Sequence, residues 1–307
     1  MSILLADVGG TNARLALAGD QGLDPASIRR FRGDDHASFD EVVRLYLEEM
    51  NLASVEAVCV DVAGPVGNGE AKLTNRDWSF SEAGLRVLTG AKQARLINDM
   101  VALGYATPGL SGEALGEVRA APEGRSRNGQ RLVVNAGTGF NVCAVKVLPQ
   151  GGIACLEAEE GHTRMPLTIA EALAAEVPAS TLPGFDSVEE LFAGRGLSRL
   201  HAARTGQPAI RAEEVTQAAA TDAEACATCD IYARLFGLLC RELALRFMPM
   251  EGIYLAGSVA RSAAHRQQIF LDAFLSDPLM VRIPQSVPIH VIRDDMAALH
   301  GCLAAVS

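Results

Sequence analysis

Residues 3–17 read ILLADVGGTNARLAL: an apolar run, one carboxylate, two glycines and two small polar residues, followed by a second alternating run. This pattern predicts a β-hairpin whose turn, Gly9–Asn12, presents backbone N–H groups that can bind an anion. Gly9 and Gly10 permit positive φ and let a ligand approach the main chain closely. Asp7, beside such a turn, suggests a metal that arrives with a phosphate and is held through water, as Mg2+ usually is. An ordinary hairpin turn explains the same residues, and the pattern by itself favours that simpler interpretation.

The length and charge of the chain narrow the classes of function. A chain of 307 residues can bury a large core and suggests two domains. Apolar residues make up 49% of it, and the formal net charge is 27 − 37 = −10. This charge argues against nucleic acid or an anionic membrane as a partner, because both require a basic face. ATP remains possible, since phosphate sites use backbone N–H groups and local magnesium.

The sequence predicts a cytoplasmic protein. No basic segment with an apolar core precedes the first strand, so we expect no signal peptide. No apolar run is long enough to span a bilayer. The seven cysteines are odd in number and lie mostly in apolar segments, which indicates reduced core thiols rather than a disulfide framework.

The first third of the chain reads as a mixed sheet with helical crossovers. Apolar periodicity and capping boxes predict its elements. We expect strands at Ala26–Phe31, Glu56–Ala63, Ala71–Thr74 and Ala94–Ile97, and helices after the capping boxes Ser38–Glu41 and Ser79–Glu82 and from Met100.

A second half begins after Pro108–Arg131, which is rich in Gly, Pro, Ser and Arg and therefore indicates a domain crossing. A strand, a glycine turn and a returning strand follow over residues 131–148 and resemble the N-terminal hairpin, which indicates two related halves. Beyond it we expect helices at 168–176, 189–201 and 213–247, strands at 253–256 and 288–292, and a last helix capped by Asp294 and Asp295.

Four loops follow predicted buried strands, at 7–12, 98–99, 137–141 and 257–258. Ligands gather at the carboxyl ends of strands in open α/β sheets, so these loops can face one cleft. Two glycine-rich anion turns beside acidic residues suit phosphoryl transfer. Asp99 is then the natural base for the acceptor hydroxyl. An Asn-Asp pair between a strand and a helix is also a common capping arrangement.

Glu159, His162 and Glu189 form a second group. Acids and imidazoles with fixed lone pairs can bind sugar hydroxyls, and the first turn of a capped helix would keep Glu189 ionised. Without further context, a solvated acidic turn and a structural histidine explain these residues equally well. His162 lacks partners at zinc-ligand spacing, so a zinc site is not expected.

Six motifs together resemble one family. They are DVGGTNARLA from Asp7, LTNRDW from Leu73, IND from Ile97, AGTG from Ala136, EEGH from Glu159 and FAGRGL from Phe192. With these motifs the chain resembles the bacterial glucokinases of the enteric type, members of the superfamily of sugar kinases, actin and heat-shock chaperone ATPases. The resemblance runs from Asp7 to the C-terminal helix.

The resemblance implies a fold and a set of roles. The fold is an α/β, two-domain, actin-like ATPase (ribonuclease H-like) fold with a mixed sheet in each domain and a cleft between them. The small domain would comprise residues 1–106 and 293–307, and the large domain residues 107–292. Asp99 would be the catalytic base, and Asp7 would hold Mg2+ through water. The implied ATP-binding residues are Asp7, Gly9, Gly10, Thr11, Asn12, Gly137, Thr138 and Gly257. The implied sugar-binding residues are Asn98, Asp99, Thr138, Gly139, Glu159, His162 and Glu189.

The implied activity is an ATP-dependent hexokinase of glycolysis that phosphorylates the 6-hydroxyl of glucose, in the cytoplasm and as a homodimer. A kinase of another hexose, a catalytically impaired sugar sensor and an ATPase without a sugar acceptor are the alternatives. Four positions depart from the family pattern: Asn141 and Glu160 replace glycines, Arg195 replaces a proline, and Ala256-Gly257-Ser258 replaces a motif with paired glycines. Glu160 is expected to put an extra charge near the sugar turn. All four lie near the implied nucleotide or sugar, so the preferred hexose and the phosphate donor, ATP or polyphosphate, stay open.

Overall fold

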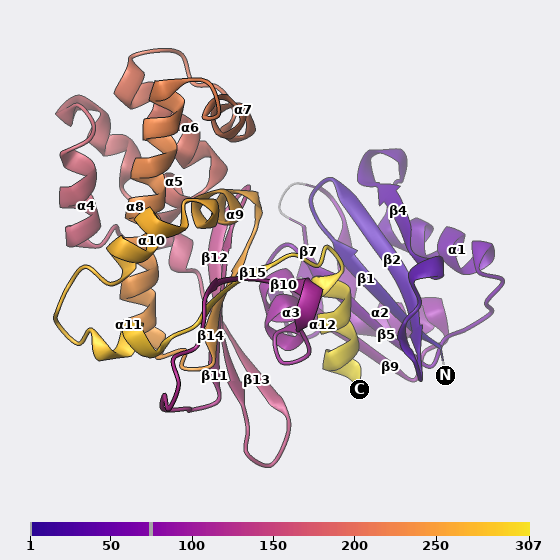
Figure 1. Cartoon of the computed structure of the whole chain (residues 1–307). Helices are drawn as coiled ribbons and strands as arrows, with labels where there is room; N and C mark the ends of the chain where they lie inside the picture. The colour runs from indigo at the N-terminus through magenta and orange to yellow at the C-terminus, as the bar shows by residue number, and fades with distance from the viewer. Residues whose placement is uncertain (1, 74–75) are drawn as a thin grey trace. The chain divides into compact units, whose positions relative to one another are not determined.

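The computed structural model describes residues 2–73 and 76–307. The chain forms two compact units (Figure 1): Met1–Leu110 together with Asp294–Ser307, and Ser111–Arg293. The C-terminal helix therefore packs in the first unit, although the whole second unit separates it from the N-terminal hairpin in the sequence.

The first unit is built on a mixed sheet. The predicted hairpin is present as antiparallel β1 and β2, and β5 and β9 extend the sheet in parallel on the other side of β1. Every residue of β5 is buried, as the continuous apolar run predicted. The strands are β1 (Ile3–Val8), β2 (Asn12–Gly19), β3 (Gly22–Leu23), β4 (Arg29–Arg32), β5 (Ala57–Val62) and β9 (Gln93–Asn98), in the order β3-β2-β1-β5-β9 with β4 also on β2.

Helices cover both faces of this sheet (Figure 1). Leu4, Val58 and Val60 point toward α1 (Phe39–Glu49) and α2 (Glu82–Thr89) within one apolar cluster. Side chains alternate along a strand, so Asp7 and Asp61 lie on the opposite face. That face carries α3 (Asp99–Ala106) and α12 (Ala297–Val306). A small antiparallel sheet of β6 (Val66–Gly67), β7 (Glu70–Lys72) and β8 (Ser79–Ser81) completes the unit.

The second unit repeats the strand plan of the first. Antiparallel β11 and β12 form a hairpin, and β14 and β15 follow in parallel beside β11, as β5 and β9 follow β1. This equivalence supports the two related halves inferred from the sequence. The strands are β10 (Leu115–Arg119), β11 (Gln130–Ala136), β12 (Phe140–Val147), β13 (Ile153–Glu157), β14 (Gly252–Ala256) and β15 (Ile289–Ile292), in the order β10-β15-β14-β11-β12-β13.

The long helix α8 (Ala223–Phe247) anchors the helical layer of this unit (Figure 1). Tyr232 and Phe236 on α8 stack on one another and belong to the same apolar cluster as Leu132 and Val134 of β11. The other helices are α4 (Leu167–Ala174), α5 (Val188–Phe192), α6 (Gly194–Thr205), α7 (Ala212–Ala218), α9 (Ser258–His265), α10 (Gln267–Phe274) and α11 (Arg282–Ser286).

Two predicted helices are each interrupted. The helix expected at 189–201 is α5 and α6, because Ala193 is extended (ψ 171°) where Gly194 N donates a hydrogen bond to Gly137 O at 2.7 Å. The helix expected at 213–247 is α7 and α8, because Asp222 starts a new helix by accepting a hydrogen bond from Ala225 N at 2.7 Å. A loop distant in sequence contributes to the first break, whereas a local cap makes the second.

Two further predictions need correction. Ser79 does not cap a helix, because it belongs to β8; Ser81 is the N-cap of α2 and accepts a hydrogen bond from Gly84 N at 3.0 Å. The strand predicted at Ala26–Phe31 begins later, as β4, after a short 3-10 turn at Pro25–Ser27. Across residues 2–73 and 76–307, no helix combines the length and apolar character needed to cross a bilayer.

Candidate active site

The predicted site residues form two sets, one in each unit. In the first unit, the turn Gly9–Asn12 joins β1 to β2 and is closed by a hydrogen bond from Gly9 N to Asn12 O at 2.9 Å. Neither Gly9 nor Gly10 uses the positive φ that glycine permits. A Cβ added to Gly9 would meet only Asn12 O, at an ordinary 3.7 Å. The fold itself therefore does not require glycine at Gly9, whereas a ligand lying close against the turn would.

Three carboxyl groups gather on the α3 and α12 face of the first sheet. Asp7 lies opposite Asp61 in the parallel register of β1 and β5, and Asp99 begins α3 directly after β9. Burial raises the pKa of Asp7, which the Arg14 guanidinium at 3.9 Å lowers in part. Burial raises the pKa of Asp99 to about 6; the Met100 N–H group lowers it and the charge of Asp7 raises it. The result is a concentration of negative charge in which a carboxyl group titrates near neutral pH.

Asp61 is a member of this group that the sequence analysis missed. Its side chain is 0% exposed, and Cys302 Sγ of α12 lies 3.2 Å from Asp61 Oδ2. Burial raises the pKa of Asp61 well above its ordinary value, and the charges of Asp7 and Asp99 raise it further. An acid in the middle of an otherwise apolar buried strand was the signal that could have identified it.

The Asn98-Asp99 pair caps α3, which is one of the two interpretations offered by the sequence. Asn98 Oδ1 accepts a hydrogen bond from Met100 N at 2.9 Å and so caps α3, while Asn98 Nδ2 donates one to Gly64 O at 3.0 Å. Asp99 Oδ1 also accepts from Met100 N at 2.9 Å. Capping therefore fixes the start of the helix that carries Asp99.

The loop with the motif LTNRDW is described only in part, because Thr74 and Asn75 lie outside the described residues. Arg76 binds Gly33 O and Asp34 and lies over the ring of Trp78, with its guanidinium carbon 5.2 Å from the ring centroid. Arg76 thus ties its end of the loop to the segment after β4.

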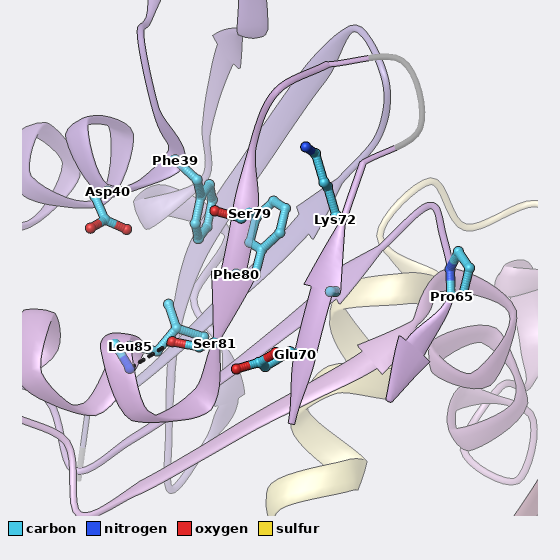
Figure 2. A pocket seen from close by; sticks show the side chains of 11 residues that line it. Phe39, Asp40, Pro65, Glu70, Lys72, Ser79, Phe80, Ser81 and Leu85 are labelled. Atoms are coloured by element: carbon cyan, nitrogen blue, oxygen red, sulfur yellow. Dashed lines mark hydrogen bonds between the residues drawn. The ribbon is translucent and has the colours of Figure 1, made fainter. Parts of the chain in front are cut away.

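A polar pocket of about 720 Å³ opens beside this small sheet (Figure 2). It is lined by α1, β7, β8 and the start of α2, with Asp40, Glu70 and Lys72 among its side chains. None of the predicted site residues lines it.

In the second unit, three glycine positions meet at the ends of β11 and β14. Gly137 O accepts from Gly194 N at 2.7 Å, and a Cβ on Gly137 would lie 3.8 Å from Gly257 Cα. Gly257 has φ of +86°, and a Cβ there would lie 2.2 Å from Ala136 O, so only glycine fits. The single glycine of Ala256-Gly257-Ser258 thus supplies the positive φ and the absence of a side chain that let the end of β14 lie close to the end of β11.

Glu189 lies against the loop at Gly137–Gly139. Its Oε2 accepts a hydrogen bond from Phe140 N at 2.8 Å, and a Cβ on Gly139 would come within 2.8 Å of the same oxygen. Gly161 is equally confined, because its Cβ would lie 2.3 Å from Phe140 O and 3.2 Å from Glu189 Cβ. The predicted sugar acid and the predicted phosphate loop are therefore neighbours in the second unit.

Glu159 and His162 lie on a short turn beside β12. Their side chains are 69% and 71% exposed and approach to 3.9 Å. Asn141 joins this turn to β12: its Oδ1 accepts from Glu160 N at 3.1 Å, and its Nδ2 donates to Glu159 Oε2 at 3.4 Å. Asn141, noted in the sequence only as a departure, therefore orients the turn that carries both predicted sugar ligands.

The extra acid at Glu160 does not add charge beside Glu159, as the sequence suggested. Its side chain is 8% exposed and forms an ion pair with Arg246 of α8. This pairing neutralises the substituted acid and fastens the turn to the helical layer. Among the described residues, no cluster of three or more His, Cys, Asp or Glu side chains has a geometry suited to direct metal ligation.

The fold and the glycine turns of the two units define the class of protein. Two mixed sheets with the same strand plan, each with a glycine turn after its first strand, characterise the actin-like ATPase fold of the sugar kinases. The fold class predicted from the sequence is confirmed by solved structures. A glucokinase from an Antarctic psychrotroph matches with a TM-score of 0.84 at 27% identity, over 99% of this chain and 98% of that one. A ROK-family glucokinase from Streptomyces griseus, solved with glucose and AMPPNP, matches with a TM-score of 0.64 at 17% identity, over 100% and 99%.

The family follows from the sequence relatives. The glucokinase of Caulobacter vibrioides is 31% identical over 99% of this chain and 95% of its own length. The profile of the glucokinase family matches residues 4–307. The chain belongs to the glucokinase family, and the resemblance stated from its motifs is confirmed.

Proposed function

We propose that the protein transfers the γ-phosphoryl group of ATP to the 6-hydroxyl of glucose. Membership of the glucokinase family over residues 4–307 supports this activity. The observation in the structure that carries it is Asp99, a buried carboxyl group with a pKa of about 6 at the start of a capped helix. Such a group is ionised at neutral pH and basic enough to accept the proton of a reacting hydroxyl.

The first unit would bind the phosphates and the metal. A side chain at Gly9 would fill space that the fold leaves open, and Asp7 is 28% exposed, so these residues fit a phosphate and a hydrated Mg2+. Bound Mg2+ would neutralise charge on the phosphates. Asp7 would hold the metal through water, and the ATP-binding groups would include Gly10, Thr11 and Asn12.

The second unit would bind the sugar and the rest of the nucleotide. Glu159, His162 and Glu189 would accept and donate hydrogen bonds to hydroxyls, together with Asn98 from the first unit. The loop with Gly137, Thr138 and Gly139 would contact both the phosphates and the sugar, and Gly257 would lie against the nucleotide. Holding the 6-hydroxyl near Asp99 and the phosphate is the main contribution expected of these residues.

We propose residues 1–106 with 293–307 as the small domain and residues 107–292 as the large domain. Closure of the domains on the sugar would exclude water and so limit hydrolysis of ATP. A homodimer, a cytoplasmic location and a role in glycolysis complete the proposal.

The test is the release of ADP by the purified protein with each of a panel of hexoses. The proposal expects sugar-dependent turnover with the highest kcat/KM for glucose. A higher value for another hexose would reassign the substrate. Calorimetric binding of sugar without binding or turnover of ATP would show a sensor, and ATP hydrolysis independent of sugar would show an ATPase.

A further inference from the structure

Glu189 is held at both of its carboxylate oxygens. Phe140 N donates to Oε2 at 2.8 Å, and Arg195 Nη2 donates to Oε1 at 2.7 Å. The Glu189 side chain is 16% exposed and that of Arg195 is 45% exposed. The pair therefore lies at an accessible surface, with the carboxylate deeper than the guanidinium.

The interruption between α5 and α6 places Arg195 where it can reach Glu189. The chain is extended at Ala193, and Gly194 N binds Gly137 O at 2.7 Å, so α6 starts beside the loop at Gly137–Gly139. In a continuous helix, a residue six positions after Glu189 would be rotated about the helix axis by about 600° relative to Glu189. It would therefore lie on a different face of the helix from Glu189. The break thus brings the arginine back to the acid.

The arginine is part of a row of alternating charges. Arg195 also binds Glu190 Oε1, through Nε at 3.1 Å and Nη2 at 3.0 Å, and Glu190 Oε2 in turn pairs with Arg199. Arg199 resembles Arg195 in its contact with Glu190, but its other hydrogen bond goes to Gly184 O. Only Arg195 of these two arginines contacts the predicted sugar ligand.

We infer that Arg195 is a positioning residue of the sugar site, which fixes Glu189 in one orientation and offers a donor beside it. A sugar hydroxyl has one proton to donate and lone pairs to accept with. Glu189 accepts the hydrogen bond that the hydroxyl donates, and the exposed guanidinium donates a hydrogen bond to the oxygen of the same hydroxyl. This inference rests on the proposed function, because it assumes that Glu189 binds a neutral hexose.

The fixed orientation also has an energetic effect. A carboxylate that is already ordered loses less side-chain freedom when the sugar binds. Because the charge-assisted hydrogen bond between the two side chains is partly exposed, we expect a three- to tenfold effect on glucose affinity, which corresponds to about 0.7–1.4 kcal/mol at about 1.4 kcal/mol per tenfold.

The experiment compares wild-type protein with Arg195→Ala, Arg195→Lys and the matched control Arg199→Ala. Glucose affinity is measured by calorimetry, and KM and kcat are measured with ATP. Arg195→Ala should weaken glucose binding and raise the KM for glucose about three- to tenfold, with kcat and the KM for ATP within about twofold. Arg195→Lys should restore part of the loss, and Arg199→Ala should leave glucose affinity within about twofold, because Lys keeps the charge and Arg199 does not contact Glu189.

The double variant Arg195→Ala/Glu189→Gln tests the coupling. Its loss should be smaller than the product of the two single losses, because Arg195 and Glu189 act on the same hydroxyl. Unchanged or tighter glucose binding by Arg195→Ala, an equal loss in Arg199→Ala, or multiplied losses in the double variant would overturn the inference. Wild-type protein that binds no hexose would instead refute the proposed function, so the two failures are distinguishable.

Discussion

Lowering the pH from 7 to 5 is expected to reduce kcat/KM for glucose about tenfold, because Asp99 must be ionised to accept a proton. Burial raises the pKa of Asp99 to about 6. A carboxyl group with this pKa is about nine-tenths ionised at pH 7 and about one-tenth ionised at pH 5. An unperturbed aspartate would still be about nine-tenths ionised at pH 5. The value of kcat/KM should therefore decline toward acid pH with a midpoint about two pH units above the midpoint expected for an ordinary aspartate.

The measurement is kcat/KM from pH 4.5 to 8, with ADP quantified after quenching so that no coupling enzyme limits the rate. Circular dichroism at each pH checks that the protein stays folded. Asp99→Asn is the control: it keeps the size of the side chain but cannot accept the proton, so its kcat should fall about 10²–10⁴-fold and lose the decline between pH 7 and 5.

Two results would refute the reasoning. A decline centred near pH 4 would mean that burial does not raise the pKa of the group that controls the rate. Near wild-type turnover by Asp99→Asn, with glucose still bound, would remove Asp99 from the role of base.

Three further variants test the contacts around the site. Asn141→Ala removes the hydrogen bond that orients the Glu159 turn, so the KM for glucose should rise about two- to tenfold with the KM for ATP unchanged; an unchanged KM for glucose would show that the turn orients itself. Arg246→Ala leaves the buried Glu160 carboxylate unpaired, and chemical denaturation should show a loss of about 1–3 kcal/mol at pH 7, discounted for the exposure of Arg246; a stability equal to wild type would contradict this. Gly301→Ala places a methyl group 1.7 Å from the Ala102 carbonyl oxygen of α3, so the melting temperature of the protein should fall. The kcat should fall as well, because α3 carries Asp99 at its start. A variant as stable and active as wild type would show that α12 can shift without cost.

Local patterns were enough to predict most elements of the first unit. The alternation around Gly9–Asn12 predicted the hairpin of β1 and β2, and the unbroken apolar run at Glu56–Ala63 predicted the buried strand β5. The amphipathic face after Ser38 predicted α1, whose N-cap is Ser38. These features succeed because periodicity and capping depend on residues a few positions apart.

The contacts of the substituted site residues could not be predicted in this way. Glu160 was expected to add charge near the sugar turn, but it pairs with Arg246, 86 positions later in the chain. Asp61 was overlooked because its partners Asp7 and Cys302 come from other elements of the sheet and from the last helix. A side chain's neighbours across a fold leave no periodic signal in the sequence.

The sequence by itself determined the residues that the chain offers for chemistry: a glycine turn beside Asp7, an Asn-Asp pair after a buried strand, and the fold class that contains them. Only the tertiary structure decided the state of those groups. Packing of β1, β5 and α3 gathers three carboxyl groups and raises the pKa of Asp99 to about 6. The extended residue between α5 and α6 brings Arg195 to Glu189. The physical reason is that residue type sets which bonds a group can make, whereas burial and charge from distant residues set its pKa and which partner it finds.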